Sequence, residues 1–373
     1  MKTLTILSAM LVVLFIAAAA HAVQFDYIDP GFTQQIYTGP LVGGPGMAWT
    51  SAGNLLTKAG SNIIEYSLTQ NATYQSSPTP ATPIHSSIAT HSISGLSTSG
   101  YGLTKGLDGK IYTPTGGGLQ RFDPNNWASA AVTLTGTSSQ GYGITTLPDG
   151  RIAYSDGLTP SKIYLYDPTL LTDTPIYTAP YQVDDIEASV TGAIAMAGRG
   201  STGTIDIISN TGSLINSFGT GVHYPDGLAF GDGVTANWLY SNNNDGTITQ
   251  FQLGPGYLGT PTMVVIASQS PLPYGKAYGD LAAVGPDCAF YVSQGDNHGA
   301  NGSDANIGTH WDNGVTTNES SIIRIAAVDR NGVEFCGFGS ATEGVPEPAT
   351  LLLVLTGLVF LFFRNRWARS ARP

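Results

Sequence analysis

The chain has 373 residues, of which only 11% are charged, together with 47 Gly and 22 Pro. Few charges and many turn-forming residues argue against a mainly helical protein and favour short strands joined by tight turns. Without Lys2, Glu347 and the four arginines after residue 363, residues 23–344 carry 10 Lys and Arg against 25 Asp and Glu, a net charge of −15. This charge argues against binding to nucleic acid and suits a protein that binds divalent cations.

Residues 1–22 have the pattern of a secretory signal peptide. Lys2 supplies the positive charge, residues 4–20 are apolar, and Ala20-His21-Ala22 fits the cleavage pattern of small residues. We expect cleavage after Ala22 by signal peptidase. The alternative is an N-terminal membrane anchor, but this apolar run is short for a helix that spans a bilayer.

The body starts with a strand predicted at residues 32–38 (FTQQIYT), and a first repeat begins at Gly46. Residues 69–98 are rich in Ser, Thr, Pro and Ala. We expect them to form an exposed insertion with little fixed structure, in which His85 and His91 are solvated.

Short strands separated by Gly-containing turns then recur along the chain. The first apolar residues of the units at Leu103, Ile144, Ile186 and Leu228 are 41, 42 and 42 residues apart. The flanking gaps, 56 residues from Met47 and 53 to Leu281, are longer and are attributed to insertions. A period near 42 is typical of propeller blades, so the six units predict an all-β, six-bladed β-propeller over residues 23–344.

The ring of blades is expected to close through residues 32–38, added as an outer strand to the last blade. A lone blade cannot cover its two apolar faces, whereas a ring gives each blade two neighbours. The absence of long helical periodicity excludes a doubly wound α/β body.

No motif for a nucleophile elbow, a metalloprotease helix or a phosphate loop occurs in the sequence. Residues 254–259 match G-x-G-x-x-G, but the stretch contains a proline and opens no helix, so we expect an inter-blade loop. We name no catalytic residue.

The turns that precede the innermost strands should meet at one mouth of the central channel. At this position the units carry Tyr101, Tyr142, Asp184 and Asp226. Neighbouring carboxylates repel one another unless a cation lies between them, so Asp184 and Asp226 are candidate metal ligands.

The PDGLAF stretch around Asp226 resembles the regucalcin/gluconolactonase and NHL-repeat type of six-bladed propeller. In the first of these families, acidic and amide residues at such turns hold a channel metal. The resemblance extends to Asp226 and, more weakly, to Asp184. This chain departs from the family pattern at two places. Tyr101 and Tyr142 stand where the family would have an amide ligand, and no acidic residue near Met47 matches the family's first acidic ligand.

Residues 295–318 form a second predicted insertion, rich in Asp, Asn and Gly. It offers Asp296, Asp304 and Asp312 as calcium ligands, although a polar surface loop has the same composition. Trp311 with Tyr101 and Tyr142 is a candidate sugar-stacking platform; ordinary packing is the alternative.

Cys288 and Cys336 are the two cysteines. In an exported protein an even pair favours a disulfide, with two buried thiols as the alternative.

The C-terminus combines three features in order: a short motif, an apolar run at residues 349–363 and a basic cluster. The motif is Val345, Pro346, Glu347 and Pro348, and the cluster is Arg364, Arg366, Arg369 and Arg372. This arrangement resembles the PEP-CTERM sorting signal, which implies a transmembrane helix, cleavage by an exosortase and delivery to the cell surface or extracellular matrix. A simple C-terminal membrane anchor is the alternative.

These patterns favour a non-enzymatic, exported propeller that binds a polysaccharide or another surface protein. The alternative is a metal-dependent lactonase or hydrolase that uses the channel face with Asp226 and Asp184.

Overall fold

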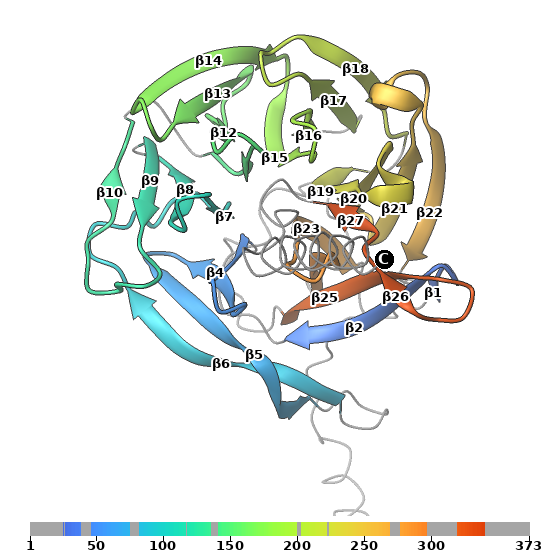
Figure 1. The fold of residues 1–373 in the computed structure, drawn as a ribbon, viewed down its shortest axis with the longest axis horizontal. Helices are drawn as coiled ribbons and strands as arrows, with labels where there is room; N and C mark the ends of the chain where they lie inside the picture. The colour runs from blue at the N-terminus through green and yellow to red at the C-terminus, as the bar shows by residue number, and fades with distance from the viewer. Residues whose placement is uncertain are drawn as a thin grey trace, which may run out of the picture.

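Six antiparallel sheets stand around a common axis in the computed structural model (Figure 1). The structure describes residues 25, 27–38, 46–74, 82–116, 118–135, 141–199, 203–221, 224–268, 277–296 and 319–339. Within these ranges the helical segments are two 3-10 turns, η1 (Gly233–Thr235) and η2 (Pro255–Tyr257), and no helix there is long and apolar enough to cross a membrane. The predicted all-β, six-bladed propeller is confirmed. The predicted signal peptide (1–22), sorting motif and C-terminal helix (349–363) lie outside the described residues.

The first four blades are four-stranded meanders, each made from one continuous stretch of chain. Blade 1 has β3 (Met47–Trp49), β4 (Leu55–Ala59), β5 (Asn62–Tyr74) and β6 (Thr82–Ser92). Blade 2 has β7 (Thr104–Lys105), β8 (Ile111–Thr115), β9 (Gly118–Phe122) and β10 (Val132–Thr133). Blade 3 has β11 (Ile144–Thr146), β12 (Ile152–Ser155), β13 (Ser161–Asp167) and β14 (Thr172–Ala179). Blade 4 has β15 (Gln182–Ala188), β16 (Ile194–Arg199), β17 (Thr204–Ile208) and β18 (Leu214–Gly219).

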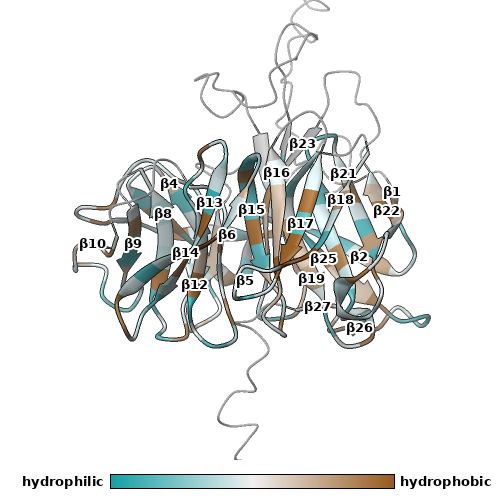
Figure 2. Cartoon of the chain, turned by 90° about the horizontal axis from the view of Figure 1, so that it is seen from above, coloured by the Kyte–Doolittle hydropathy of each residue, from teal (hydrophilic) through white to brown (hydrophobic). Residues whose placement is uncertain are grey.

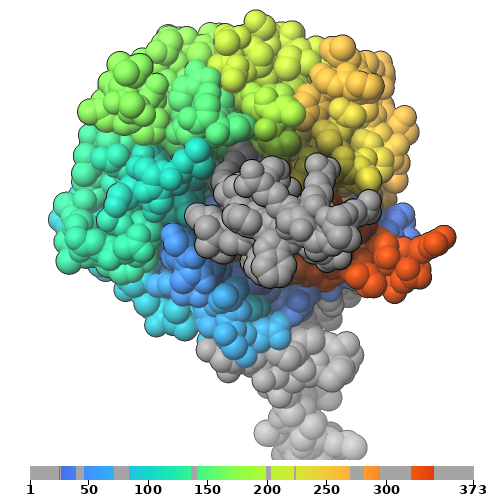
Figure 3. Space-filling model, viewed as in Figure 1, coloured from blue at the N-terminus to red at the C-terminus, as the bar shows by residue number. Residues whose placement is uncertain are grey.

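The last two blades also take strands from both ends of the chain. Blade 5 has β19 (Pro225–Gly231), β20 (Trp238–Asn243), β21 (Thr247–Gln252) and β22 (Thr262–Ser268), with β1 (Tyr27–Ile28) outside and β27 (Phe338–Gly339) beside β19. Blade 6 has β23 (Ala277–Val284), β24 (Phe290–Asp296), β25 (Glu319–Val328) and β2 (Phe32–Thr38), while β26 (Glu334–Phe335) also pairs with β25. The predicted closure by residues 32–38 is therefore confirmed, and the first and last parts of the body lie side by side (Figure 3).

The hydrophobic core is divided among the junctions between blades. The described residues form six buried clusters, and each contains side chains from two neighbouring blades. Seen from the side, hydrophobic residues recur along strands of blade 4 such as β15 and β17 (Figure 2). Because successive side chains of a strand point to opposite faces, each blade buries apolar residues on both sides and depends on both neighbours.

Residues 69–98 do not form the loose insertion expected from their composition. β5 extends to Tyr74 and β6 spans Thr82–Ser92, so most of this stretch is the outer hairpin of blade 1. His85 is buried and stacks on Tyr37 with ring centroids 3.9 Å apart, and His91 stacks on Trp127 at 3.6 Å. A Ser- and Thr-rich edge strand resembles a loop in composition because its outer face is polar. Of the second predicted insertion, Gly295 and Asp296 end β24, and residues 297–318 lie outside the described residues.

Residues 254–259 connect β21 and β22 through the turn η2. Both strands belong to blade 5, so the inter-blade position expected for this stretch is wrong. The loop occurs within a blade because β22 pairs with β21 as the fourth strand of the same meander and does not start a new one.

The predicted disulfide between Cys288 and Cys336 is present. Cys288 is the last residue of a four-residue turn in blade 6 and has a φ of 56°. The corresponding turns of blades 1 to 4 each end in a glycine with a positive φ. The four glycines have φ between 75° and 87°: Gly53, Gly109, Gly150 and Gly192. A left-handed backbone is unfavourable for cysteine, so the disulfide occupies a position where the repeat otherwise selects glycine.

Candidate functional site

The candidate site is the mouth of the channel where the innermost strands begin. Tyr101, Tyr142, Asp184 and Asp226 each lie two positions before the first apolar residue of their unit, on blades 2, 3, 4 and 5. Since the innermost strands of a propeller start at the same end of the ring, these four residues belong to one rim. We call this set the channel rim.

Two half-buried tyrosines form one side of the channel rim. The rings of Tyr101 and Tyr142 are stacked with centroids 5.6 Å apart and an interplanar angle of 14°. They come from adjacent blades, so the pair forms an aromatic surface that crosses a blade junction. Such offset stacking is a favourable geometry for aromatic rings.

Two carboxylates follow on the next blades, and the same local irregularity presents both. Asp184 is the extra residue where the pairing of β15 with β16 shifts between Val183 and Asp185. Asp226 is the extra residue at the corresponding shift between Pro225 and Gly227, in the pairing of β19 with β20. β-Bulges redirect side chains and are common beside functional sites, so the structure gives both candidate ligands a distinctive backbone.

Beneath the rim, neighbouring blades approach each other through their backbones. A Cβ at Gly46 would lie 1.7 Å from the Tyr101 carbonyl oxygen, and one at Gly102 would lie 2.0 Å from that of Tyr142. A Cβ at Gly143 would likewise lie 2.6 Å from the backbone nitrogen of Ile186. Each glycine immediately precedes the first apolar residue of its unit, and no larger residue fits there without moving a blade.

Blade 4 has Asp185 at this position instead of glycine. Its carboxylate accepts a 2.7 Å hydrogen bond from the backbone N–H of Leu228 on blade 5. The pKa of the Asp185 carboxyl is raised to about 7 in total. Burial is the main cause and the charge of Asp226 adds to it, whereas backbone hydrogen bonds from Leu228 and Ile186 partly oppose it. The junction of blades 4 and 5 therefore contains a side chain that titrates near neutral pH.

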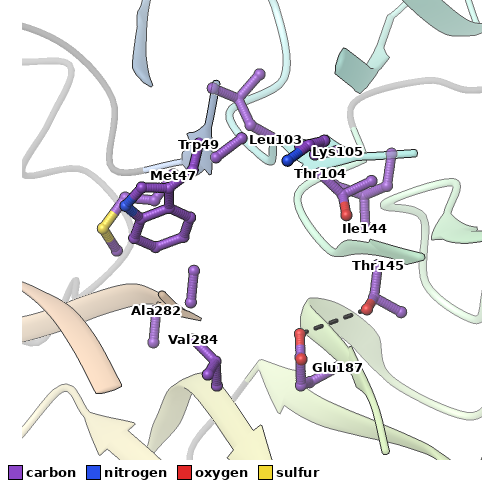
Figure 4. A pocket seen from close by; sticks show the side chains of 12 residues that line it. Met47, Trp49, Leu103, Thr104, Lys105, Ile144, Thr145, Glu187, Ala282 and Val284 are labelled. Carbon is purple, nitrogen blue, oxygen red and sulfur yellow. Dashed lines mark hydrogen bonds between the residues drawn. The ribbon is translucent and has the colours of Figure 1, made fainter. Parts of the chain in front are cut away.

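Further along the innermost strands, a small cavity of about 40 Å³ lies in the channel between five blades. Its polar side includes Glu187, which accepts a 3.4 Å hydrogen bond from the Thr145 hydroxyl, and Met47 and Trp49 lie across from this pair (Figure 4). The volume suffices for about two or three water molecules and is too small for a sugar ring. A ligand of that size would bind at the rim rather than in this cavity.

The structure brings some of the predicted site residues together and leaves others untested. The four rim residues are described, whereas Trp311, Asp304, Asp312 and the sorting residues are not. Among the residues that the structure describes, no group of three or more His, Cys, Asp or Glu side chains is arranged to hold a metal ion. Asp184 and Asp226 stay candidate ligands.

Sequence reasoning missed Asp185 and Lys58. Asp185 is detectable by aligning the units, because it stands where blades 1, 2, 3 and 5 have glycine. Lys58 is buried in β4 and contacts the turn before Tyr101, and nothing in the sequence around it indicates that role.

Comparison with known proteins supports the fold. No family model and no curated protein sequence matches the chain. Among solved structures, a Trichoderma reesei enzyme of Carbohydrate-Active Enzymes Family AA12, in its calcium structure, is similar with a TM-score of 0.53 at 13% identity, covering 82% of this chain and 99% of that one. The PQQ-bound aldose sugar dehydrogenase of Streptomyces coelicolor has a TM-score of 0.50 at 12% identity, covering 80% and 99%.

A gluconolactonase-like protein has a TM-score of 0.46 at 13% identity, covering 82% of this chain and 98% of that one. The structural neighbours thus include gluconolactonase-like and sugar dehydrogenase propellers. At such low identity these similarities show the fold alone.

Replacing Asp185 with Asn tests the titrating junction. The folded-state pKa of Asp185 is raised from 3.8 to about 7, so its contribution to stability is fully present below pH 4 and is lost as pH rises to 7. The substituted amide keeps an acceptor for the Leu228 N–H but has no charge. Asp185→Asn should therefore be more stable than wild type at pH 8, by on the order of 4 kcal/mol, with the advantage shrinking toward pH 4. Urea unfolding from pH 4 to pH 8 measures this difference, and a constant difference would contradict the assignment.

Proposed function

We propose that the protein is an exported, non-enzymatic propeller that binds a polysaccharide at its channel rim. The observation that carries this proposal is the stacked pair of Tyr101 and Tyr142, which crosses a blade junction at the mouth of the channel. Tyrosine presents a flat apolar face and a polar hydroxyl, which complement the C–H face and the hydroxyl groups of a sugar ring.

The other half of the rim supplies the polar contacts that such a ligand needs. Asp226 is half-buried on the bulge of blade 5, and its carboxylate is an acceptor for sugar hydroxyl groups, while Asp184 is buried on the bulge of blade 4. A concave mouth with aromatic side chains and a few polar groups is typical of a ligand site. A chain of sugars can lie across the rim without entering the small cavity further along the channel.

The proposal includes the route by which the protein reaches its place of action. Signal peptidase would remove residues 1–22, the apolar run 349–363 would hold the chain transiently in the membrane, and an exosortase would cut near residues 345–348. The body would then be at the cell surface or in the extracellular matrix. The Cys288–Cys336 disulfide supports this route, because disulfides persist in oxidising compartments.

A second candidate function is a metal-dependent lactonase or hydrolase with Asp184 and Asp226 as Ca²⁺ ligands. The observation that favours it is electrostatic: the charge of Asp226 raises the pKa of Asp185 on the neighbouring blade. A divalent cation at the rim would relieve this repulsion and supply Lewis-acid activation of a lactone carbonyl. The enzymes among the structural neighbours fit this alternative at the level of the fold.

Tyr101→Ala tests glycan binding. Loss of one ring of the pair should weaken binding to immobilised glycans about tenfold, equivalent to ~1.4 kcal/mol. Wild type and variant are compared on an array of neutral and acidic oligosaccharides. Tyr164→Ala is the matched control, because Tyr164 stacks on Tyr154 within blade 3, away from the rim. An array on which wild type binds nothing would overturn the proposed function.

Calcium tests the second candidate. If a rim metal exists, millimolar Ca²⁺ should raise the melting temperature of wild type, since a ligand that binds only the folded state stabilises it. Asp226→Ala should abolish that rise. The measurement is a thermal melt with Ca²⁺ and with chelator, and the idea fails if neither Ca²⁺ nor the substitution changes melting.

Removing residues 345–373 tests the sorting route. The truncated protein should be released from the membrane during export, because the apolar run and the arginines are gone. Fractionation with immunoblotting measures its location. Glu347→Ala retains the apolar run and should stay in the membrane at full length, whereas a simple anchor predicts identical size for this variant and wild type.

A further inference from the structure

Lys58 on β4 is a buried charged residue outside the channel rim. Only 1% of its surface is exposed, yet its ammonium group donates hydrogen bonds to two backbone carbonyls of the next blade. The Nζ atom lies 2.9 Å from the Ser99 oxygen and 2.6 Å from the Gly100 oxygen. Burial lowers the pKa of this group to about 8, which is the expected effect of removing an ammonium group from water.

The two carbonyls belong to the residues directly before Tyr101. The same turn is restrained on its other sides. Gly100 has a φ of 77°, and a Cβ there would lie 1.9 Å from the Pro114 oxygen. The Ser99 hydroxyl accepts a 2.8 Å hydrogen bond from the Gly116 N–H. Lys58 thus adds a polar contact from blade 1 to a turn that Pro114 and Gly116 of blade 2 also restrain.

The corresponding position in blade 2 shows what packing alone requires. Strand pairing aligns Thr57 with Thr113, so Lys58 corresponds to Pro114. A Cβ at Gly141, the residue before Tyr142, would lie 2.8 Å from the Pro114 Cβ. The turn before Tyr142 is therefore supported by an apolar ring, whereas the turn before Tyr101 is supported by an ammonium group.

This difference indicates a role for Lys58 beyond filling space. Burying a charge is costly, and an apolar residue of similar volume often stabilises a protein as well or better. Two charge-assisted hydrogen bonds fix the height of a turn more strictly than apolar contact does, because their lengths and angles are restricted.

We propose that Lys58 is a positioning residue that sets the Tyr101 ring against Tyr142 and so shapes the aromatic half of the channel rim. This inference rests on the proposed glycan-binding function for its purpose, but the ring geometry can be measured without any glycan. Lys58 contacts no ligand itself. It acts through the backbone of Ser99 and Gly100, which is continuous with Tyr101.

The test uses the whole exported body with three variants. Lys58→Met removes the donors at similar volume, and Lys58→Gln keeps an N–H₂ donor without charge. Lys110→Met is the matched control, because Lys110 in blade 2 pairs with Asp123 at the surface. The first readout is near-ultraviolet circular dichroism, in which the difference between wild type and Tyr101→Phe defines the contribution of the tyrosine pair.

Lys58→Met should lose most of that contribution and bind the strongest array glycan of wild type at least fivefold more weakly, while Lys58→Gln should recover most of both. Lys110→Met should match wild type. A folded Lys58→Met protein with wild-type dichroism overturns the positioning role, even if glycan binding by wild type is established. Should Lys58→Met fail to fold, Lys58→Leu replaces it: loss of the tyrosine-pair dichroism in a folded protein supports the role, and wild-type dichroism overturns it. Absence of glycan binding in wild type, with the dichroism changed as expected, would instead refute the proposed function alone.

Discussion

The ring depends on how closely the innermost strands of neighbouring blades approach. Gly46, Gly102 and Gly143 bring the backbone of one blade against that of the next, at separations that no side chain would allow. The six hydrophobic clusters fill the junctions between neighbouring blades. A glycine next to the first apolar position thus lets blades 1, 2 and 3 approach their neighbours closely, because steric contact sets how far each blade can move inward.

Two buried ionisable residues outside the channel rim depart from this pattern. Asp185 replaces backbone contact with a carboxylate hydrogen bond, and Lys58 supports a turn with an ammonium group where Pro114 suffices in the next blade. Both are buried polar groups, one in β4 and the other in β15. Local departures from the packing pattern are expected near functional surfaces, where stability is exchanged for defined geometry. They surround the turns that present Tyr101, Tyr142, Asp184 and Asp226.

The blade number, the innermost strands, the closing strand and the disulfide could all be predicted from sequence, because each leaves a periodic or compositional signal. Leu103, Ile144, Ile186 and Leu228 keep a regular spacing, and every junction requires an apolar residue there. The outer strand β6 could not be recognised, because its Ser and Thr content resembles that of a loop, although its His85 packs on Tyr37 and its His91 on Trp127. The rim residues could be located from their spacing to the first apolar residue of each repeat. The bulges at Asp184 and Asp226 could not, because they depend on how the two strands pair, and the sequence gives no signal for that pairing.

The strands at the two ends of the body determine the order in which the blades can be completed. β1 and β2 join blades 5 and 6 from the start of the body, and β26 and β27 join the same two blades from its end. A chain that is synthesised from its N-terminus can complete blades 1 to 4 in order, because each is one continuous stretch. β1 can pair once β22 is present, whereas β2 keeps an unpaired edge until β25 is available. Closure of the ring therefore comes late in synthesis, and a chain that stops before residue 319 would leave β2 without its partner β25.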